Sequence, residues 1–235
     1  MSDLTLREGA RRFGVELDEA QLRQFAHYRA ELLDWNQRVN LTAITDPEAA
    51  DQLHFLDSLA CLLEPIDRGA RLLDVGAGGG FPGLPLKIAR PDLRLTLLEA
   101  TGKKARFLEY VVQALGVSDV DILHDRAETA PGAGSFDIVV ARALGPMAVL
   151  LELTLPFCSI GGKVLAAKKG AGISSELQLA GYALQLLGGE LAQPRSYELA
   201  GEERQIVVVR KVSATPGGYP RRPGMPAKKP LRLSD

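Results

Sequence analysis

The spacing of apolar residues divides the chain into a helical first part and a second part with an alternating pattern. In the first part, a set of apolar side chains falls near one helical face: Leu22, Phe25, Ala26, Leu32 and Leu33. Asp18, with Gln21 three residues later, predicts a capped start for this helix. Asp46 and Pro47 predict the start of a second helix, which should end before Pro65.

From Arg71 onward, short apolar runs alternate with amphipathic stretches. Strands are predicted at residues 71–75, 94–99, 119–123, 136–141, 162–167, 190–198 and 204–211. Helices are predicted at residues 82–90, 102–116, 145–157 and 173–187. Repeated β-α units imply an α/β fold with a mostly parallel, seven-stranded sheet covered by helices on both faces. The turn at Ala200-Gly201-Glu202 makes the last two strands an antiparallel hairpin, and this plan is typical of Rossmann-like methyltransferases.

These patterns divide the chain into a helical extension at 1–65, an α/β domain at 66–211 and a tail at 212–235. Seven basic residues and no acidic ones stand from Arg210 to Arg232, interrupted by prolines. Because proline lacks an N–H and fixes φ, the tail should be extended or irregular. Its charge suits contact with a phosphate backbone, although a solvated tail explains the same pattern.

The bulk composition is that of an ordinary globular protein. Of the 235 residues 46% are apolar and 24% are charged, and the net charge of −1 gives no global attraction to nucleic acid. The two cysteines, Cys61 and Cys158, form neither a disulfide framework nor a zinc site, which suits a reducing cytosol. No secretory signal and no membrane-spanning run is visible. We therefore expect a cytoplasmic protein with no membrane partner and no metal.

A glycine-rich turn follows the apolar run that ends at Asp74, and its glycines fit two spacings. Gly78, Gly80 and Gly83 match the G-x-G-x-x-G pattern of dinucleotide sites. Gly76, Gly78 and Gly80 match the G-x-G-x-G pattern common in S-adenosylmethionine (SAM) enzymes. Asp74 favours SAM, because a carboxylate can bind the methionine ammonium but would repel a pyrophosphate. An NAD-binding module stays open at this point.

Further candidates for the cofactor site follow the second and third strands. Glu99 lies about 20 residues beyond the glycine turn, where an acidic side chain accepts hydrogen bonds from ribose hydroxyls. Ala100 and Thr101 come next and would line the adenosine pocket. Ala127 and Glu128 follow the third strand, at the same edge of the sheet, and would meet the adenine.

Candidate substrate contacts lie after the fourth and fifth strands and on the second N-terminal helix. Arg142 stands where amine methyltransferases carry Asn/Asp-Pro-Pro-Tyr, so N6-adenine methylation is disfavoured; its guanidinium could bind a base edge or a phosphate. His54, Asp57 and Ser58 share one helical face and could line a cleft. A capping and salt-bridge network explains them equally well, and Lys168 could be a solvated lysine at a strand end.

Together these residues resemble a known family, the bacterial small-subunit ribosomal RNA guanine-N7 methyltransferases (RsmG or GidB). The resemblance covers nearly the whole chain and rests on these pieces: Asn40-Leu41-Thr42, His54-x-x-Asp57-Ser58, Asp74-Val-Gly-x-Gly-x-Gly-Phe-Pro-Gly-x-Pro-Leu86, Arg126-Ala-Glu128, Ala141-Arg142-Ala143 and Tyr219-Pro-Arg221-Arg222-Pro-Gly. It implies the Rossmann-like class I SAM-dependent fold and a cytoplasmic monomer.

The resemblance also implies methyl transfer from SAM to N7 of one guanine in the decoding region of 16S ribosomal RNA. The implied cofactor residues are Gly76, Phe81, Ala127, Glu128 and Arg142, completed by Glu99, Ala100 and Thr101. We expect Asn40, His54 and Asp57 to face the guanine, Arg142 and Lys168 to lie on its phosphate or base side, and Arg221 and Arg222 to grip RNA. The alternative is a SAM-dependent enzyme that acts on another RNA or on a small molecule.

Overall fold

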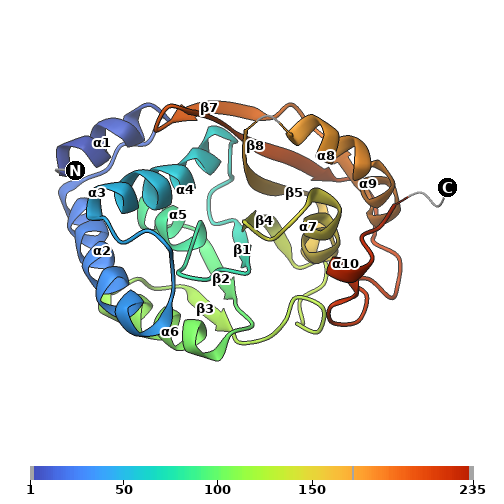
Figure 1. Cartoon of the computed structure of the whole chain (residues 1–235), viewed down its shortest axis with the longest axis horizontal. Coiled ribbons are helices and arrows are strands. Elements are labelled where there is room, and N and C mark those ends of the chain that lie inside the picture. The colour runs from blue at the N-terminus through green and yellow to red at the C-terminus, as the bar shows by residue number, and fades with distance from the viewer. Residues whose placement is uncertain (1–2, 171, 233–235) are drawn as a thin grey trace.

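The computed structural model describes residues 3–170 and 172–232, and a twisted sheet runs through the middle of them (Figure 1). Its strands are β1 (Arg71–Val75), β2 (Arg94–Leu98), β3 (Val120–Leu123), β4 (Phe136–Arg142), β5 (Cys158–Lys169), β6 (Gly189–Leu191), β7 (Arg195–Leu199) and β8 (Glu202–Lys211). Within the described residues the order is β3-β2-β1-β4-β5-β8-β6, with β7 paired to β8. The first five strands are parallel and β8 is antiparallel to β5, which confirms the predicted Rossmann-like plan.

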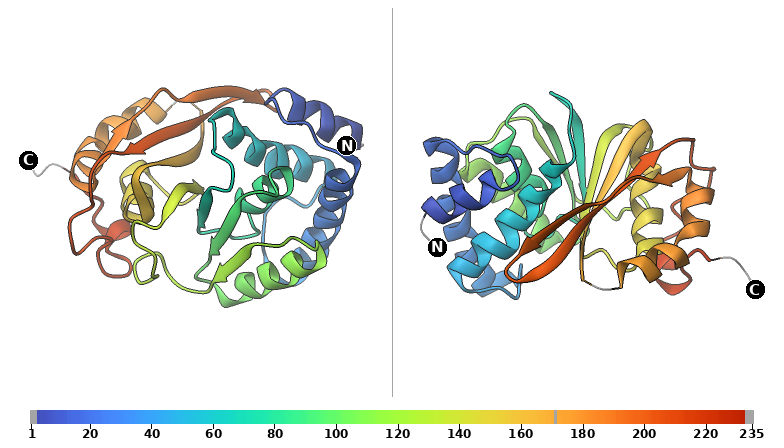
Figure 2. Two further views of the ribbon diagram at one scale, coloured as in Figure 1. Left: turned by 180° about the vertical axis from the view of Figure 1, so that it is seen from behind. Right: turned by 90° about the horizontal axis from the view of Figure 1, so that it is seen from above.

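Helices cover both faces of this sheet (Figure 2). They are α1 (Asp3–Arg11), α2 (Glu19–Val39), α3 (Pro47–Ala50), α4 (Asp57–Leu59), α5 (Gly83–Ala89), α6 (Gly102–Ala114), α7 (Met147–Thr154), α8 (Ile173–Leu179), α9 (Gly181–Leu187) and α10 (Met225–Lys228). Side chains of α1, α2, α5 and α6 join one hydrophobic cluster, and those of α7 to α9 join a second one on the other face. The N-terminal helices therefore share a core with the sheet.

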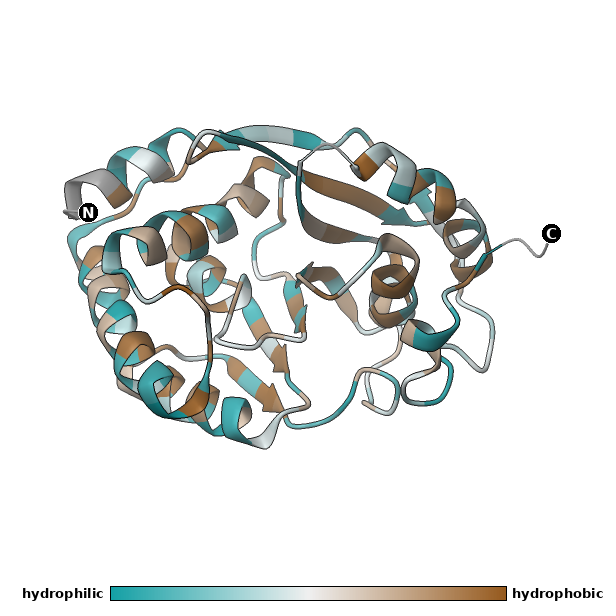
Figure 3. Cartoon of the chain, viewed as in Figure 1, coloured by the Kyte–Doolittle hydropathy of each residue, from teal (hydrophilic) through white to brown (hydrophobic). Residues whose placement is uncertain are grey.

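The central strands are mostly apolar in their middle parts because both of their faces are covered. Successive side chains of a strand point to opposite faces; Leu72 accordingly lies in one cluster and Leu73 in the other. The colouring of Figure 3 shows this as brown segments in the inner strands and in α7. The runs of apolar residues that predicted these strands are thus explained by burial on two sides.

The N-terminal helices begin where their capping residues predicted. The Asp18 carboxylate accepts a hydrogen bond from the Gln21 N–H at 2.8 Å, and the Gln21 side chain accepts one from the Asp18 N–H at 2.9 Å. The second helical stretch starts at Pro47 and ends before Pro65, as expected. It is not a uniform α-helix, because a π-helical turn, η1 (Asp51–Leu56), stands in its middle. Such turns are frequent at functional sites.

The predicted count of seven strands was wrong by one. The run expected at 190–198 is two strands, β6 and β7, which pair with different parts of β8. Pro194 lies between them, and proline cannot donate to a strand ladder. The helix expected at 173–187 is likewise divided into α8 and α9, with the break at Ala180.

The prolines predicted an extended or irregular tail, but part of the tail is helical. Four of its residues form the short helix α10. Pro226 lies in the first turn of this helix, where a missing N–H costs nothing. In Figure 1 this helix lies beside α7, so the tail folds back on the protein. Across residues 3–170 and 172–232, moreover, no helix combines the length and the hydropathy of a membrane span.

Candidate functional site

The glycine turn after β1 has a backbone that side chains would strain. Gly76, Gly78 and Gly80 have φ values of +72°, +59° and +93°, in the left-handed region that glycine adopts most readily. A Cβ on Gly80 would also lie 2.5 Å from the hydroxyl oxygen of Tyr28. The N-terminal helix α2 therefore packs directly against the turn and supports its shape.

Asp74, at the end of β1, is completely buried beside this turn. Its Oδ2 accepts a hydrogen bond from the Gly83 N–H at 2.8 Å, and within the described residues its Oδ1 has no partner. Burial raises the pKa of Asp74 to about 7, against the lowering effects of the Gly83 bond and of Arg142. An orphaned carboxylate oxygen is suited to accept a hydrogen bond from an ammonium group, so this residue fits the methionine end of SAM.

Glu99 ties the glycine turn to the loop after β2. One carboxylate oxygen accepts from the Gly78 N–H at 2.8 Å and the other accepts from the Thr101 N–H at 2.7 Å. Each oxygen keeps a second lone pair, so these bonds leave room for the predicted hydrogen bonds from ribose hydroxyls. Glu99 is buried, and the bonds between its carboxylate and these two backbone N–H groups fix the distance between the two loops.

A mostly apolar recess opens beside these loops at the carboxyl edge of β1 to β3. Among the residues that line it are four predicted cofactor residues: Gly76, Ala100, Ala127 and Glu128. The other lining comes from strand ends, from the loops after β3 and β4, from α7 and from the tail: Val75, Leu98, Asp125, Arg126, Leu144, Val149, Leu153, Gly224, Pro226 and Ala227. A recess with apolar walls and a few polar groups suits a flat heterocyclic base.

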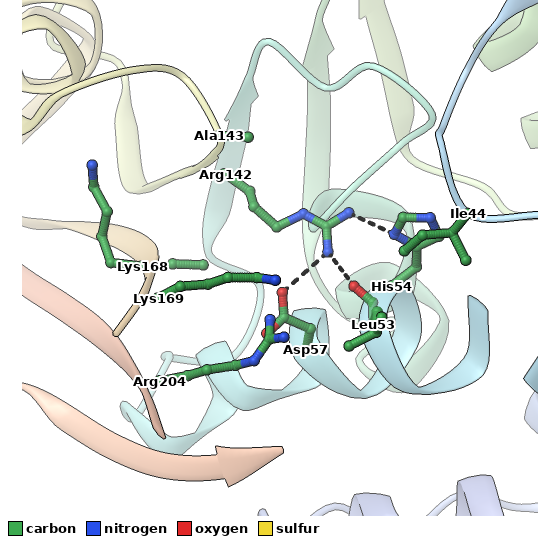
Figure 4. Close-up of a pocket in the computed structure, with 10 residues that line it drawn as sticks. Ile44, Leu53, His54, Asp57, Arg142, Ala143, Lys168, Lys169 and Arg204 are labelled. Carbon is green, nitrogen blue, oxygen red and sulfur yellow. Dashed lines mark hydrogen bonds and ion pairs between the residues drawn. The ribbon is translucent and has the colours of Figure 1, made fainter. Parts of the chain in front are cut away.

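A second cavity lies between the helical stretch that starts at Pro47 and the ends of β4, β5 and β8 (Figure 4). It is lined by Ile44, Leu53, His54, Asp57, Arg142, Ala143, Ala167, Lys168, Lys169 and Arg204. Four of the five predicted catalytic residues come together here: His54, Asp57, Arg142 and Lys168. Adjacent residues of the loop after β4 line the two cavities, since Ala143 faces this one and Leu144 faces the recess.

Arg142 is the centre of this cavity. Its Nη1 donates to Asp57 Oδ2 at 3.1 Å and to the Leu53 carbonyl at 2.8 Å, and its Nη2 lies 3.0 Å from His54 Nδ1. The guanidinium carbon also lies 5.0 Å from the centre of the Phe81 ring, a cation–π contact. Figure 4 shows the Arg142 guanidinium directed at His54, Leu53 and Asp57, which follow one another along the helical stretch that starts at Pro47.

His54 serves this arrangement as a neutral side chain. Because Arg142 donates to its Nδ1, the ring proton belongs on Nε2, which lies 2.8 Å from Thr42 Oγ1. Burial and the Arg142 charge lower the pKa of His54 to about 4. The ring stacks on Phe81 at 4.4 Å, and Phe81 stacks in turn on Tyr28. His54 therefore orients Arg142 and carries no charge at neutral pH.

Two residues of the β7–β8 hairpin complete the network and were missed by the sequence analysis. Asp57 Oδ1 accepts from the Tyr197 hydroxyl at 2.8 Å and from Arg204 Nη1 at 2.9 Å. Arg204 is only 2% exposed and also pairs with Glu202 at 2.9 Å. The predicted hairpin turn could have put Tyr197 opposite Arg204, which is their register. No sequence signal shows that Tyr197 and Arg204 lie on the face of the sheet against which Asp57 packs.

The remaining predicted residues lie elsewhere or are already engaged. Asn40 is the exposed C-cap of α2 and lines neither cavity. Lys168 donates to the Gly145 carbonyl at 2.8 Å and to Glu176 at 2.7 Å, and Figure 4 shows it directed away from Arg142. Arg221 pairs with Glu152, whereas its neighbour Arg222 is exposed. In residues 3–170 and 172–232 there is no cluster of acidic, histidine or cysteine side chains that could hold a metal ion.

The chain is similar over most of its length to known proteins of one family. Residues 21–207 match a family model described as GidB, rRNA small subunit methyltransferase G. A ribosomal RNA small subunit methyltransferase G of Roseiflexus castenholzii is 47% identical over 93% of this chain and 95% of the relative. One of Halalkalibacterium halodurans is 44% identical over 93% of this chain and 94% of the relative.

Solved structures are similar in fold. A SAM dependent methyltransferase from Aquifex aeolicus superposes with a TM-score of 0.53 at 15% identity, over 70% of this chain and 93% of that one. TYW2 of M. jannaschii, solved in complex with AdoMet, superposes with a TM-score of 0.52 at 13% identity, over 62% of this chain and 71% of that one. At such low identity the likeness concerns the fold alone, a mostly parallel sheet covered by helices.

Proposed function

Because the chain belongs to the rRNA small subunit methyltransferase G family, we propose that it transfers a methyl group from SAM to N7 of a guanine in the decoding region of 16S ribosomal RNA. The observation that carries this proposal is the pair of cavities on either side of one loop. Arg142 and Ala143 line one cavity and Leu144 lines the other. Such an arrangement lets a cofactor and a base approach each other across the loop after β4.

In this proposal the recess holds the adenosyl part of the cofactor. Ala127 and Glu128 line it beside the adenine, and Glu99 accepts from the ribose hydroxyls. The unpartnered Oδ1 of Asp74 accepts from the methionine ammonium. SAM supplies an electrophilic methyl group on a sulfonium when it is bound. The Arg142 cavity, which the loop after β4 also lines, would receive the guanine.

The residues that line the Arg142 cavity position the guanine and transfer no proton. N7 of guanine has a free in-plane lone pair, so no general base is needed, and neutral His54 is not assigned that role. A cationic donor at the cavity wall can bind the adjacent O6 and leave N7 free; Arg142 and Lys169 are the candidates. The Asp57 carboxylate neutralises part of the Arg142 and Arg204 charge, which would otherwise oppose the positive charge that the purine gains.

The test is incubation of the protein with labelled SAM and either small-subunit RNA or assembled particles. We expect label in one guanine, and chemical cleavage specific for N7-methylguanine should map it to the decoding region. Arg142→Ala should abolish labelling, whereas Arg232→Ala, at the exposed end of the tail, should not. Label on another atom or base would contradict the proposal. SAM binding without any RNA methylation would favour the small-molecule alternative, and tight NAD binding without SAM binding would overturn both.

The same proposal includes a cytoplasmic monomer. Cys61 and Cys158 are both buried free thiols, as is usual in a reducing compartment. Sedimentation of the purified protein over a range of concentrations should give the mass of one chain. A mass that grows with concentration toward two chains would contradict the monomer.

A further inference from the structure

The tail segment, defined here as residues 219–231, is packed against the protein although its charge pattern predicted a solvated or RNA-binding arm. Leu231 is only 7% exposed and Pro226 is buried. Leu231 belongs to the hydrophobic cluster under α7, and Tyr219 packs against the same cluster. Figure 1 shows the segment looping back so that α10 rests beside α7. The tail segment is therefore a part of the folded domain.

One ion pair fastens this segment to α7. Glu152 is completely buried, and its carboxylate accepts from Arg221 Nε at 2.8 Å, from Nη2 at 2.7 Å and from the Arg221 backbone N–H at 3.0 Å. A forked guanidinium–carboxylate pair of this kind is both strong and directional. The same Nη2 donates to the Lys229 carbonyl at 2.7 Å, which closes the segment on itself.

A second contact brings the segment to the recess assigned to the cofactor. The Gly224 N–H donates to Glu128 Oε1 at 2.9 Å. Gly224, Pro226 and Ala227 line the recess together with Ala127 and Glu128. The recess thus has walls from the sheet edge and from α7, and the tail segment supplies another. Without the segment, this side of the recess would be open to water.

We propose that the tail segment is a part of the cofactor site: residues 224–227 form the wall against the adenosyl group of SAM, and Arg221 positions that wall through Glu152. This inference rests on the placement of the adenosyl group made under the proposed function. Burying the flat face of a base against Pro226 and Ala227 removes apolar surface from water, which favours binding. Arg221 then acts on the cofactor, and its exposed neighbour Arg222 is the residue left free to meet RNA.

Two neighbouring arginines provide a matched test in the full-length protein. Calorimetry should be done with SAM, with its demethylated product and with adenosine. We expect the Kd of each ligand to rise about tenfold or more in Arg221→Ala, as for the loss of one favourable contact. Arg222→Ala removes the same charge from the exposed neighbouring position and should leave all three Kd values unchanged. A loss that adenosine shares marks the wall as the cause, because adenosine lacks the methionine end. Arg221→Lys, which keeps one of the bonds, should recover part of the affinity.

A second variant guards against a merely structural effect of unpairing Glu152. Ala227 is exposed and lies in the short helix α10, so Ala227→Leu should fold with an unchanged Tm while it narrows the recess. We expect a raised KM for SAM with an unchanged KM for RNA. If both Arg221→Ala and Ala227→Leu bind SAM as the wild type does, the inference is overturned.

An equal rise of the RNA KM in Arg221→Ala and Arg222→Ala, with normal SAM affinity, would show instead that the tail grips RNA, and would also overturn the inference. Failure of the wild-type protein to bind SAM is a different outcome, because it would refute the proposed function itself. If the wild type binds SAM and methylates RNA, but the SAM affinity of Arg221→Ala equals that of the wild type, only the role of the tail is refuted.

Discussion

Asp57 joins three parts of the chain, and its removal should therefore be costly. Its carboxylate accepts from Arg142 at the end of β4, from Tyr197 on β7 and from Arg204 on β8. The change Asp57→Ala deletes all three bonds, leaves the Arg142 guanidinium without its acidic partner and leaves Arg204 with Glu202 alone. We expect both a loss of stability and a displaced Arg142.

The size of this loss follows from burial. The side chains of Asp57, Arg142 and Arg204 are 5%, 17% and 2% exposed. Removing one partner of a buried ion pair costs about 3–5 kcal/mol. Three separate bonds to a charged group, at about 1.5–3 kcal/mol each, would sum to more, but they share one carboxylate and their energies do not add. We expect about 3–5 kcal/mol, which lowers Tm by about 6–20 °C in a chain of this size.

Urea unfolding at neutral pH measures this free energy, with Asp137→Ala as the control. Asp137 also binds one arginine through several bonds, but that pair with Arg71 is 43% and 49% exposed, so it should contribute no more than about 1 kcal/mol. A loss below about 1 kcal/mol in Asp57→Ala, with normal SAM affinity and methylation, would refute the idea that Asp57 holds Arg142 in place.

Three further predictions concern the cofactor loop and the hairpin. Because burial raises the pKa of Asp74 to about 7, protonation of its carboxylate should weaken SAM binding as the pH falls from about 7.5 to about 5.5. Calorimetry on Asp74→Asn should give weak SAM binding that does not change over this pH range. An equal pH dependence in this variant and in the wild type would contradict the role of Asp74. Gly83→Ala should destabilise the protein and weaken SAM binding, because its Cβ would lie 2.9 Å from Asp74 Oδ2, whereas Gly181→Ala meets nothing within 4 Å and should not alter the Tm. Arg204→Ala should lower kcat more than it raises the KM for SAM, with partial rescue by Arg204→Lys; a kcat equal to that of the wild type would exclude Arg204 as a positioning residue.

Local sequence was sufficient to predict the sheet edge and its glycine turn. Apolar runs between helical patterns predicted the strands, because a strand that is covered on both faces is mostly apolar. The capping box of Asp18 and Gln21 was also predictable, since both of its hydrogen bonds lie within four residues. The error in the strand count was local as well, because Pro194 interrupts the run at 190–198 and cannot donate to a strand ladder.

The partners of buried charges were decided only by the tertiary structure. Asp57 and Arg204 are 147 positions apart, and Arg221 meets Glu152 across 69 positions. A basic, proline-rich tail predicted an RNA contact for Arg221, and that contact stays a prediction. Charge pattern alone could not predict its pairing with Glu152, because no local pattern shows that this carboxylate of α7 is buried and needs a cation. Sequence determines backbone preference and which faces are apolar through neighbours a few residues away. Which distant side chain neutralises a buried charge depends on how the chain closes in space, and no local pattern records it.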